Sequence, residues 1–162
     1  MHYVIVAQLL ILLATANFAP IAANRLFGKR GNFPLDGGIP FFDGKPLLGP
    51  SKTVRGLLCA LAATSMVAPL IGLSIGIGAM VAALAMFGDS LSSFTKRRLR
   101  LDSSSMALGL DQIPESLLPP LACLLFLPLG ALDVLAIVLI FFFGELVLSK
   151  ILFRLHVREQ PY

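Results

Sequence analysis

Long apolar stretches alternate with short polar ones along this 162-residue chain. A membrane-spanning helix needs about 20 predominantly apolar residues, and residues 3–23 provide them without a charged side chain. Residues 56–88 also carry no charge, but they are long for one crossing. They therefore predict two helices joined by a tight turn, which we expect near Gly72, Ser74, Gly76 and Gly78.

The apolar stretch from Ser116 to Ser149 divides in the same way. Asp133 lies between its two halves, after Gly130, where a turn outside the membrane is expected. The pattern predicts an all-α integral membrane fold in one domain, residues 1–162. We expect five transmembrane helices, at about residues 3–23, 53–72, 75–94, 116–131 and 133–153.

The basic residues set the orientation of these helices. All thirteen Lys and Arg side chains fall within residues 25–55, 96–100 and 150–158. Cytoplasmic loops carry an excess of Lys and Arg, and two crossings in each long stretch place all three patches in the cytoplasm. We therefore expect the N-terminus outside the cell membrane and the C-terminus in the cytoplasm. Cytoplasmic loops 24–52 and 95–115 would then form a polar active-site cavity.

Composition excludes a soluble domain. The chain is 57% hydrophobic and 14% charged, with a mean hydropathy of +0.87, whereas soluble domains carry roughly a quarter charged residues. Cys59 and Cys123 both lie in apolar segments and lack the spacing of a zinc site, so we expect buried, reduced thiols.

The first loop contains two Asp-Gly units, Asp36-Gly37-Gly38 and Asp43-Gly44. Glycine allows a ligand to approach the backbone closely, and an adjacent carboxylate suits Mg²⁺ or a hydroxyl. Asp-Gly is also a common turn dipeptide, so two ordinary turns are the alternative. The apolar residues among these units predict that the loop folds back onto the helices.

The end of this loop opens the second helix with Lys52, Thr53 and Arg55. The free N–H groups and the dipole of a helix N-terminus favour anions, so these residues are candidates for phosphate binding. Basic side chains that reach anionic lipid headgroups are the alternative.

The second polar segment places Asp89, Ser92 or Ser93, and Lys96 on one face of a helix, because residues three, four and seven apart align. An acid at the membrane edge is costly, which favours a functional role. Asp89 and Lys96 are spaced to bracket a metal-bound phosphate, and Asp111 is a candidate second carboxylate. The alternative is a helix end at which Asp89 pairs with Lys or Arg.

Two further acids have less specific interpretations. Glu115 would complement the dipole of the fourth helix from its first turn. Glu145 lies well inside the fifth helix and would support the site through Lys52, Arg55 or Lys150.

Taken in order, these segments resemble the CDP-archaeol synthase family, which is distantly related to the phosphatidate cytidylyltransferases. The ordered set is fairly specific, and with the intervening apolar spans the resemblance covers most of the chain. Its matching elements are Asp36-Gly37-Gly38, Asp43-Gly44, Gly49 through Gly56, Gly88-Asp89, Ser93-Phe94, Lys96-Arg97-Arg98 and Leu110-Asp111-Gln112.

The resemblance implies a membrane enzyme that uses CTP and Mg²⁺ to convert a lipid phosphate to CDP-lipid and pyrophosphate, with membrane lipids and no nucleic acid as partners. The lipid would be archaetidic acid, or phosphatidic acid if the chain is a bacterial homologue. A non-enzymatic transporter or scaffold that binds anionic lipid is the competing class. For the enzyme, Asp89 and Asp111 would hold the metal ion. The basic residues Lys52, Arg55, Lys96 and Arg97 would be catalytic, and substrate contacts are expected from Asp36, Gly37, Gly38, Asp43, Gly44, Thr53, Ser93, Arg98 and Gln112.

Overall fold

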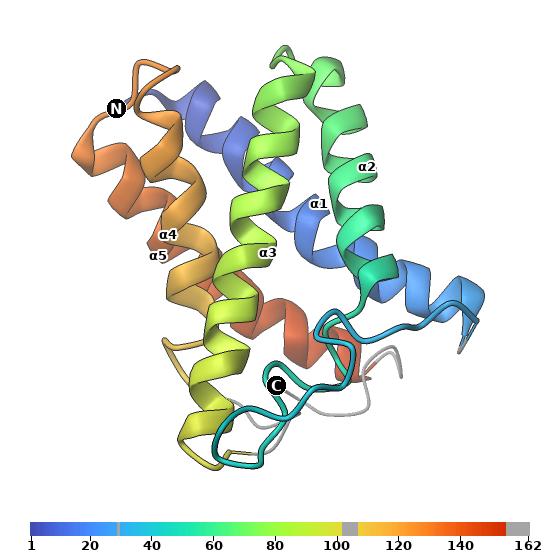
Figure 1. Cartoon of the computed structure of the whole chain (residues 1–162). Coiled ribbons are helices and arrows are strands. Elements are labelled where there is room, and N and C mark those ends of the chain that lie inside the picture. Colours follow the sequence, from blue (N-terminus) through green and yellow to red (C-terminus); the bar gives the residue numbers. More distant parts are fainter. Residues whose placement is uncertain (29, 102–106, 155–162) are drawn as a thin grey trace.

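The computed structural model describes residues 1–28, 30–101 and 107–154 (Figure 1). Its regular elements in this part of the chain are five helices, as expected for an all-α fold. They are α1 (Tyr3–Phe27), α2 (Val54–Leu70), α3 (Ile75–Arg98), α4 (Gln112–Cys123) and α5 (Ala131–Arg154).

Three of the described helices, α1, α3 and α5, are long and apolar enough to cross a membrane. Helix α2 is apolar but has only 17 residues, and α4 has 12. Many large apolar side chains are exposed on the outside of the bundle, including Phe87, Leu125 and Leu132. This surface is what a hydrocarbon solvent would cover.

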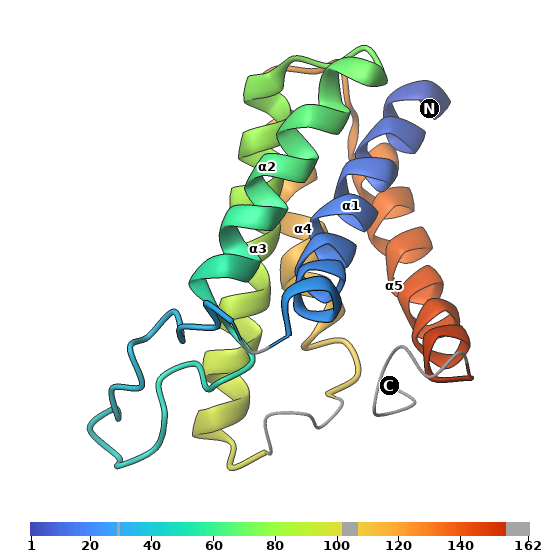
Figure 2. The ribbon, with the colours of Figure 1, turned by 90° about the vertical axis from the view of Figure 1, so that its right-hand side faces the viewer.

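Helix α3 packs against α1, α2 and α4, while α5 packs against α1 and α4 (Figure 2). The core contains Leu9, Leu12 and Leu13 of α1, Val81 and Ala85 of α3, and Ile137 of α5. Cys59 and Cys123 are free thiols, as expected, although only Cys123 is fully buried.

Two glycines bring α3 unusually close to its neighbours. A Cβ atom added at Gly78 would lie 2.7 Å from the carbonyl oxygen of Thr64 on α2. One added at Gly88 would lie 2.5 Å from the carbonyl carbon of Pro114 on α4. Such distances essentially never occur for real Cβ atoms, so the backbones of both neighbouring helices depend on glycine here.

The predicted bounds of the fourth helix, residues 116–131, were wrong. Helix α4 begins at Gln112 and ends at Cys123, followed by turns over residues 124–126. Proline has no N–H and disfavours helical conformation in the residue before it, so the helix does not continue through Pro128. The segment between α4 and α5 is therefore irregular, and the helix itself is too short for a full crossing.

The other helices differ from expectation at their ends. Helix α3 continues to Arg98 instead of ending near residue 94. Helix α2 ends at Leu70, and the expected turn follows at Gly72, whose φ is 84°. Ser74 then caps α3 by accepting a hydrogen bond from the Ile77 N–H at 3.2 Å. Gly76 and Gly78, expected in that turn, lie inside α3.

The polar segments gather at one end of the bundle. The loop between α1 and α2, the C-terminal end of α3 and the N-terminal end of α4 lie together at the lower end in both views (Figures 1 and 2). The N-terminus and the α2–α3 turn lie at the opposite end. There His2 is tied to Asp133 of α5 by its backbone N–H at 2.8 Å and by its Nδ1 at 3.0 Å.

Candidate active site

The loop between α1 and α2 is folded around Asp36. One carboxylate oxygen accepts a hydrogen bond from the Gly38 N–H at 3.0 Å, and the other accepts from Leu48 at 2.8 Å and Gly49 at 3.1 Å. Burial raises the pKa of this carboxyl, but the backbone donors outweigh burial, and the pKa lies below its ordinary value. Asp36 therefore closes the loop, in agreement with the turn interpretation, and its contact with substrate stays a prediction.

Asp43 and Arg98 join this loop to the end of α3, so the loop folds back onto the helices as expected. The Arg98 guanidinium donates to Asp43 Oδ1 and to the Pro46 carbonyl, each at 2.7 Å. It also lies 4.6 Å from the ring centroid of Phe41 and 5.0 Å from that of Phe94. Arg98 is thus held by an acid and two aromatic rings.

Two ion pairs form the centre of the site. Lys52, at the end of the loop, pairs with Asp89 of α3. Lys96 of α3 pairs with Asp111, just before α4, with 2.7 Å between Nζ and Oδ1. Each pair joins two segments, and all four side chains are at most 27% exposed. The four residues predicted as metal ligands or phosphate contacts at these positions are therefore brought together.

Glu115 lies in the first turn of α4, as expected for an acid that complements the helix dipole. What the sequence did not predict is its burial: it is 3% exposed, and its Oε1 atom has no hydrogen-bond partner among the described residues. The charges of Asp89, Lys52 and Asp111 act on it. The sequence pattern did not report this burial, which accompanies a tertiary contact: the backbone of α4 at Pro114 and Glu115 approaches Gly88 of α3 closely.

The carboxylates of this cluster fit a hard cation such as Mg²⁺. Asp89, Asp111 and the unpartnered Glu115 oxygen offer only oxygen donors. Within the described residues, no three His, Cys, Asp or Glu side chains are arranged to hold a metal ion by themselves. Mg²⁺ commonly uses one or two carboxylates together with substrate phosphates and water. The donor set suits an ion that arrives with a phosphorylated substrate.

Two of the residues predicted to contact substrate form hydrogen bonds within the protein. Thr53 caps α2 by accepting from the Gly56 N–H at 3.1 Å, and Gln112 accepts from the Gly109 N–H at 2.9 Å. Ser93 is buried on α3. Positive φ angles occur at Gly37, Gly38 and Gly44, at 61°, 73° and 75°.

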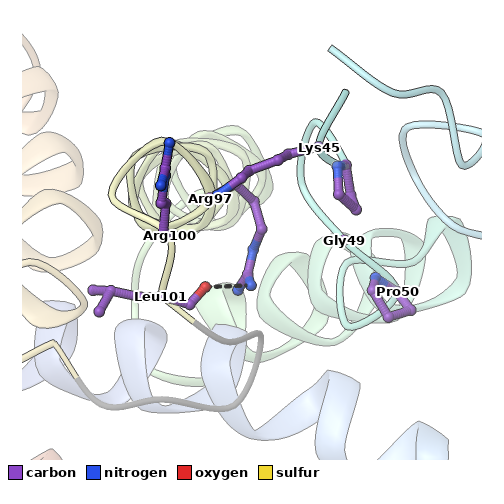
Figure 3. A pocket seen from close by; sticks show the side chains of 7 residues that line it. Lys45, Gly49, Pro50, Arg97, Arg100 and Leu101 are labelled. Atoms are coloured by element: carbon purple, nitrogen blue, oxygen red, sulfur yellow. Dashed lines mark hydrogen bonds between the residues drawn. The ribbon is translucent and has the colours of Figure 1, made fainter. Parts of the chain in front are cut away.

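Arg55 and Arg97 have different surroundings. Arg55 donates to the side chains of Asn24 at 3.0 Å and Asn32 at 3.3 Å, so these hydrogen bonds hold the loop to the end of α1. Arg97 instead lines a cavity of about 270 Å³ between the loop and the end of α3 (Figure 3). The cavity walls are Lys45, Pro46, Gly49, Pro50, Arg97, Arg100 and Leu101.

Comparison with known proteins gives a consistent result. The sequence family described as "CarS-like: CDP-archaeol synthase" matches residues 1–162. The CDP-archaeol synthase of Sulfurisphaera tokodaii is 34% identical over 142 residues, covering 84% of this chain and 85% of that protein. That of Hyperthermus butylicus is 38% identical over 104 residues, covering 60% of this chain and 59% of that protein.

One solved structure is also similar. It is described as "Structural insight into an intramembrane enzyme for archaeal membrane lipids biosynthesis". The two chains share 28% identity and a TM-score of 0.70, over 86% of this chain and 91% of the other. Together with the exposed apolar helices, this similarity shows a membrane protein.

Proposed function

The chain belongs to the CDP-archaeol synthase family, and we propose that its paired lysines and acids transfer the cytidylyl group of CTP to a lipid phosphate. The observation that carries this proposal is a pair of ion pairs, Lys52–Asp89 and Lys96–Asp111, each of which joins a residue of α3 to a residue of another segment. Two cations and two carboxylates in a partly buried cluster suit a reaction between two phosphorylated, negatively charged substrates.

The reaction forms one bond and breaks one. An oxygen of the lipid phosphate attacks the α-phosphorus of CTP, and the bond from that phosphorus to the oxygen bridging to the β-phosphate breaks. The products are CDP-lipid and pyrophosphate. The attacking phosphate is already ionised near neutral pH, so no side chain needs to remove a proton. The protein must instead position two anions and offset their repulsion.

Lys52 and Lys96 are suited to that task. Each ammonium group is held by a carboxylate from another segment, so it is positioned before substrate binds. Asp89 and Asp111 would hold Mg²⁺, with Glu115 beside them. When bound, the cation supplies charge neutralisation at the phosphate oxygens of CTP.

The isoprenoid lipid is the favoured second substrate. The similar proteins quoted above are CDP-archaeol synthases, and the similar solved structure concerns archaeal membrane lipids. These similarities favour an archaetidic acid over phosphatidic acid.

The site is proposed to face the cytoplasm at the cell membrane. Arg25, Lys52 and Lys96 lie near the same end of the bundle as the site, while His2 and Asp133 lie at the other. The excess of basic residues on cytoplasmic loops then places the N-terminus outside. In this arrangement α2 and α4 lie within the bilayer beside α3, which completes five passes or partial passes.

The direct test supplies the purified chain with labelled CTP, Mg²⁺ and a panel of isoprenoid-ether and diacyl lipid phosphates. The proposal expects CDP-lipid and pyrophosphate in equal amounts, with the isoprenoid lipid preferred. Formation of neither product with any lipid in the panel would refute it. Preference for the diacyl lipid would refute the lipid assignment alone.

A further inference from the structure

The basic side chains around the site divide into two groups. Lys52, Lys96 and Arg98 each pair with an acid. Arg97 and Arg100 at the end of α3, and Lys45 on the facing loop, line one cavity instead (Figure 3). Among the described residues, no carboxylate lies within 4.0 Å of a charged nitrogen of these three. Within the part of the chain that the structure describes, the cavity therefore has positive charge without a compensating acid.

Arg97 is the most buried of the three cations. It is 8% exposed, and its Nη1 donates to the Leu101 carbonyl at 2.7 Å. Its Nε is buried and has no hydrogen-bond partner among the described residues. Removing a charge from water without pairing it is costly, and a guanidinium offers a planar set of donors that matches phosphate oxygens. The state of Arg97 favours an incoming anion.

Arg100 occupies a position that ordinarily suits glycine. Its φ is 63°, in the left-handed region, directly after the end of α3. The next residue closes the helix, because the Leu101 N–H donates to the Lys96 carbonyl at 3.0 Å. Helices that end in this way usually have glycine at the left-handed residue, since other side chains are strained there. A strained arginine on the wall of a basic cavity indicates a use for its charge.

We propose that this cavity binds the phosphate group of the lipid substrate without a metal ion. The inference rests on the proposed function and assigns its two substrates to two places. Asp89 and Asp111 can share a cation with CTP, whereas the cavity wall has no carboxylate among its residues. A phosphate monoester carries its charge in a compact group that suits a cavity lined by the three cations Lys45, Arg97 and Arg100. The cavity of about 270 Å³ includes Arg97, the residue that follows Lys96 on α3.

Phosphate binding is measured on the full chain in detergent, by calorimetric titration with inorganic phosphate in EDTA. Arg100→Gly and Lys45→Ala are each expected to weaken affinity about ten-fold, the loss of one charge-assisted hydrogen bond. Arg25→Ala is the matched control, because it removes an exposed cation that lies outside the cavity. Its affinity should equal that of the wild type.

Arg100→Gly also separates binding from folding. Glycine relieves the left-handed strain, so this variant should keep or raise the melting temperature while losing phosphate affinity. Unchanged affinity in both cavity variants would overturn the proposal. So would phosphate binding that requires Mg²⁺.

Steady-state kinetics identify the source of the phosphate. The KM for lipid phosphate should rise about ten-fold in Arg100→Gly, with the KM for CTP unchanged. A rise in the KM for CTP alone would mean that the cavity holds CTP, which contradicts the assignment. A wild-type chain that binds phosphate but makes no CDP-lipid would refute the proposed function. If the wild type makes CDP-lipid and both cavity variants keep its phosphate affinity and its KM for lipid phosphate, the assignment of the cavity alone would be refuted.

Discussion

Lys52 and Asp89, 37 positions apart in the chain, form an ion pair that joins the polar loop to the middle of the site. Lys52 comes just before α2, and Asp89 lies on α3, so the pair couples loop placement to helix packing. Both side chains remain partly accessible, at 20% and 27% exposure. A substrate or cation can therefore reach the pair and exchange partners with it.

Replacing Lys52 by alanine should remove positive charge from the reacting phosphates and leave Asp89 without its partner. Loss of one positioned charge in an active site commonly lowers turnover by about 10²–10³-fold. We expect that loss in kcat/KM, measured by CDP-lipid formation. Lys52→Arg keeps the charge and should recover part of it. Equal activity in Lys52→Ala and wild type would contradict the role of Lys52.

Gly88→Ala should separate α3 from α4. The added Cβ would lie 2.5 Å from the Pro114 carbonyl carbon, and overpacking of this kind costs about 1–3 kcal/mol. The melting temperature in detergent should fall, and turnover should fall with it because Asp89 moves relative to Glu115. Gly144→Ala is the control, since a Cβ there meets nothing within 4 Å. An unaltered melting temperature in Gly88→Ala would contradict the packing argument.

Much of the architecture follows from the pattern of apolar residues, but α4 does not. Counting apolar residues gave a long fourth helix, whereas Pro128 and the turns before it end α4 at Cys123. Local backbone constraints decided that boundary, and apolar periodicity does not report them.

The site residues likewise divide into those that sequence spacing predicted and those that it did not. Spacing on one helix was enough to group Asp89 with Lys96, and both lie in the observed cluster. Glu115 and Arg100 were not assigned to the site, because their environments arise from tertiary contacts. Glu115 is buried by the approach of α4 to Gly88, and Arg100 faces a cavity that exists only once the loop meets α3.

Acid should loosen the loop through Asp36. Because the folded protein lowers the pKa of this carboxyl, the unfolded loop binds its proton more readily. The stabilisation is therefore complete above the unfolded-state pKa, near 4, and is lost as pH falls through the folded-state value. Hydrogen exchange at the Leu48 and Gly49 amides, corrected for intrinsic rates, should accelerate over that interval.

Asp36→Ala should show fast exchange at these amides at every pH, because it removes the acceptor of three backbone hydrogen bonds. The local cost should be roughly 1–3 kcal/mol. Protection that is the same in this variant and in the wild type at neutral pH would show that Asp36 does not close the loop.

Removal of divalent cations should stop turnover, and Glu115→Gln should weaken the cation site. Replacing a carboxyl oxygen of Glu115 by an amide nitrogen beside Asp89 and Asp111 should reduce cation affinity about ten-fold or more. Mn²⁺ binding in the presence of CTP, followed by electron paramagnetic resonance, measures that affinity without turnover. Full activity of the wild type in EDTA would contradict the metal assignment, and unchanged Mn²⁺ affinity in Glu115→Gln would contradict the part given to Glu115.

The most direct test compares three carboxylate-to-amide substitutions. Asp89→Asn and Asp111→Asn change the proposed catalytic cluster, while Asp133→Asn changes an equally paired acid at the opposite end of the bundle. CDP-lipid formation from CTP and archaetidic acid should fall at least about 10²-fold in the first two variants and stay near the wild-type rate in the third, with all three chains folded. Near-wild-type turnover in both Asp89→Asn and Asp111→Asn would contradict the assignment of cytidylyl transfer to this site.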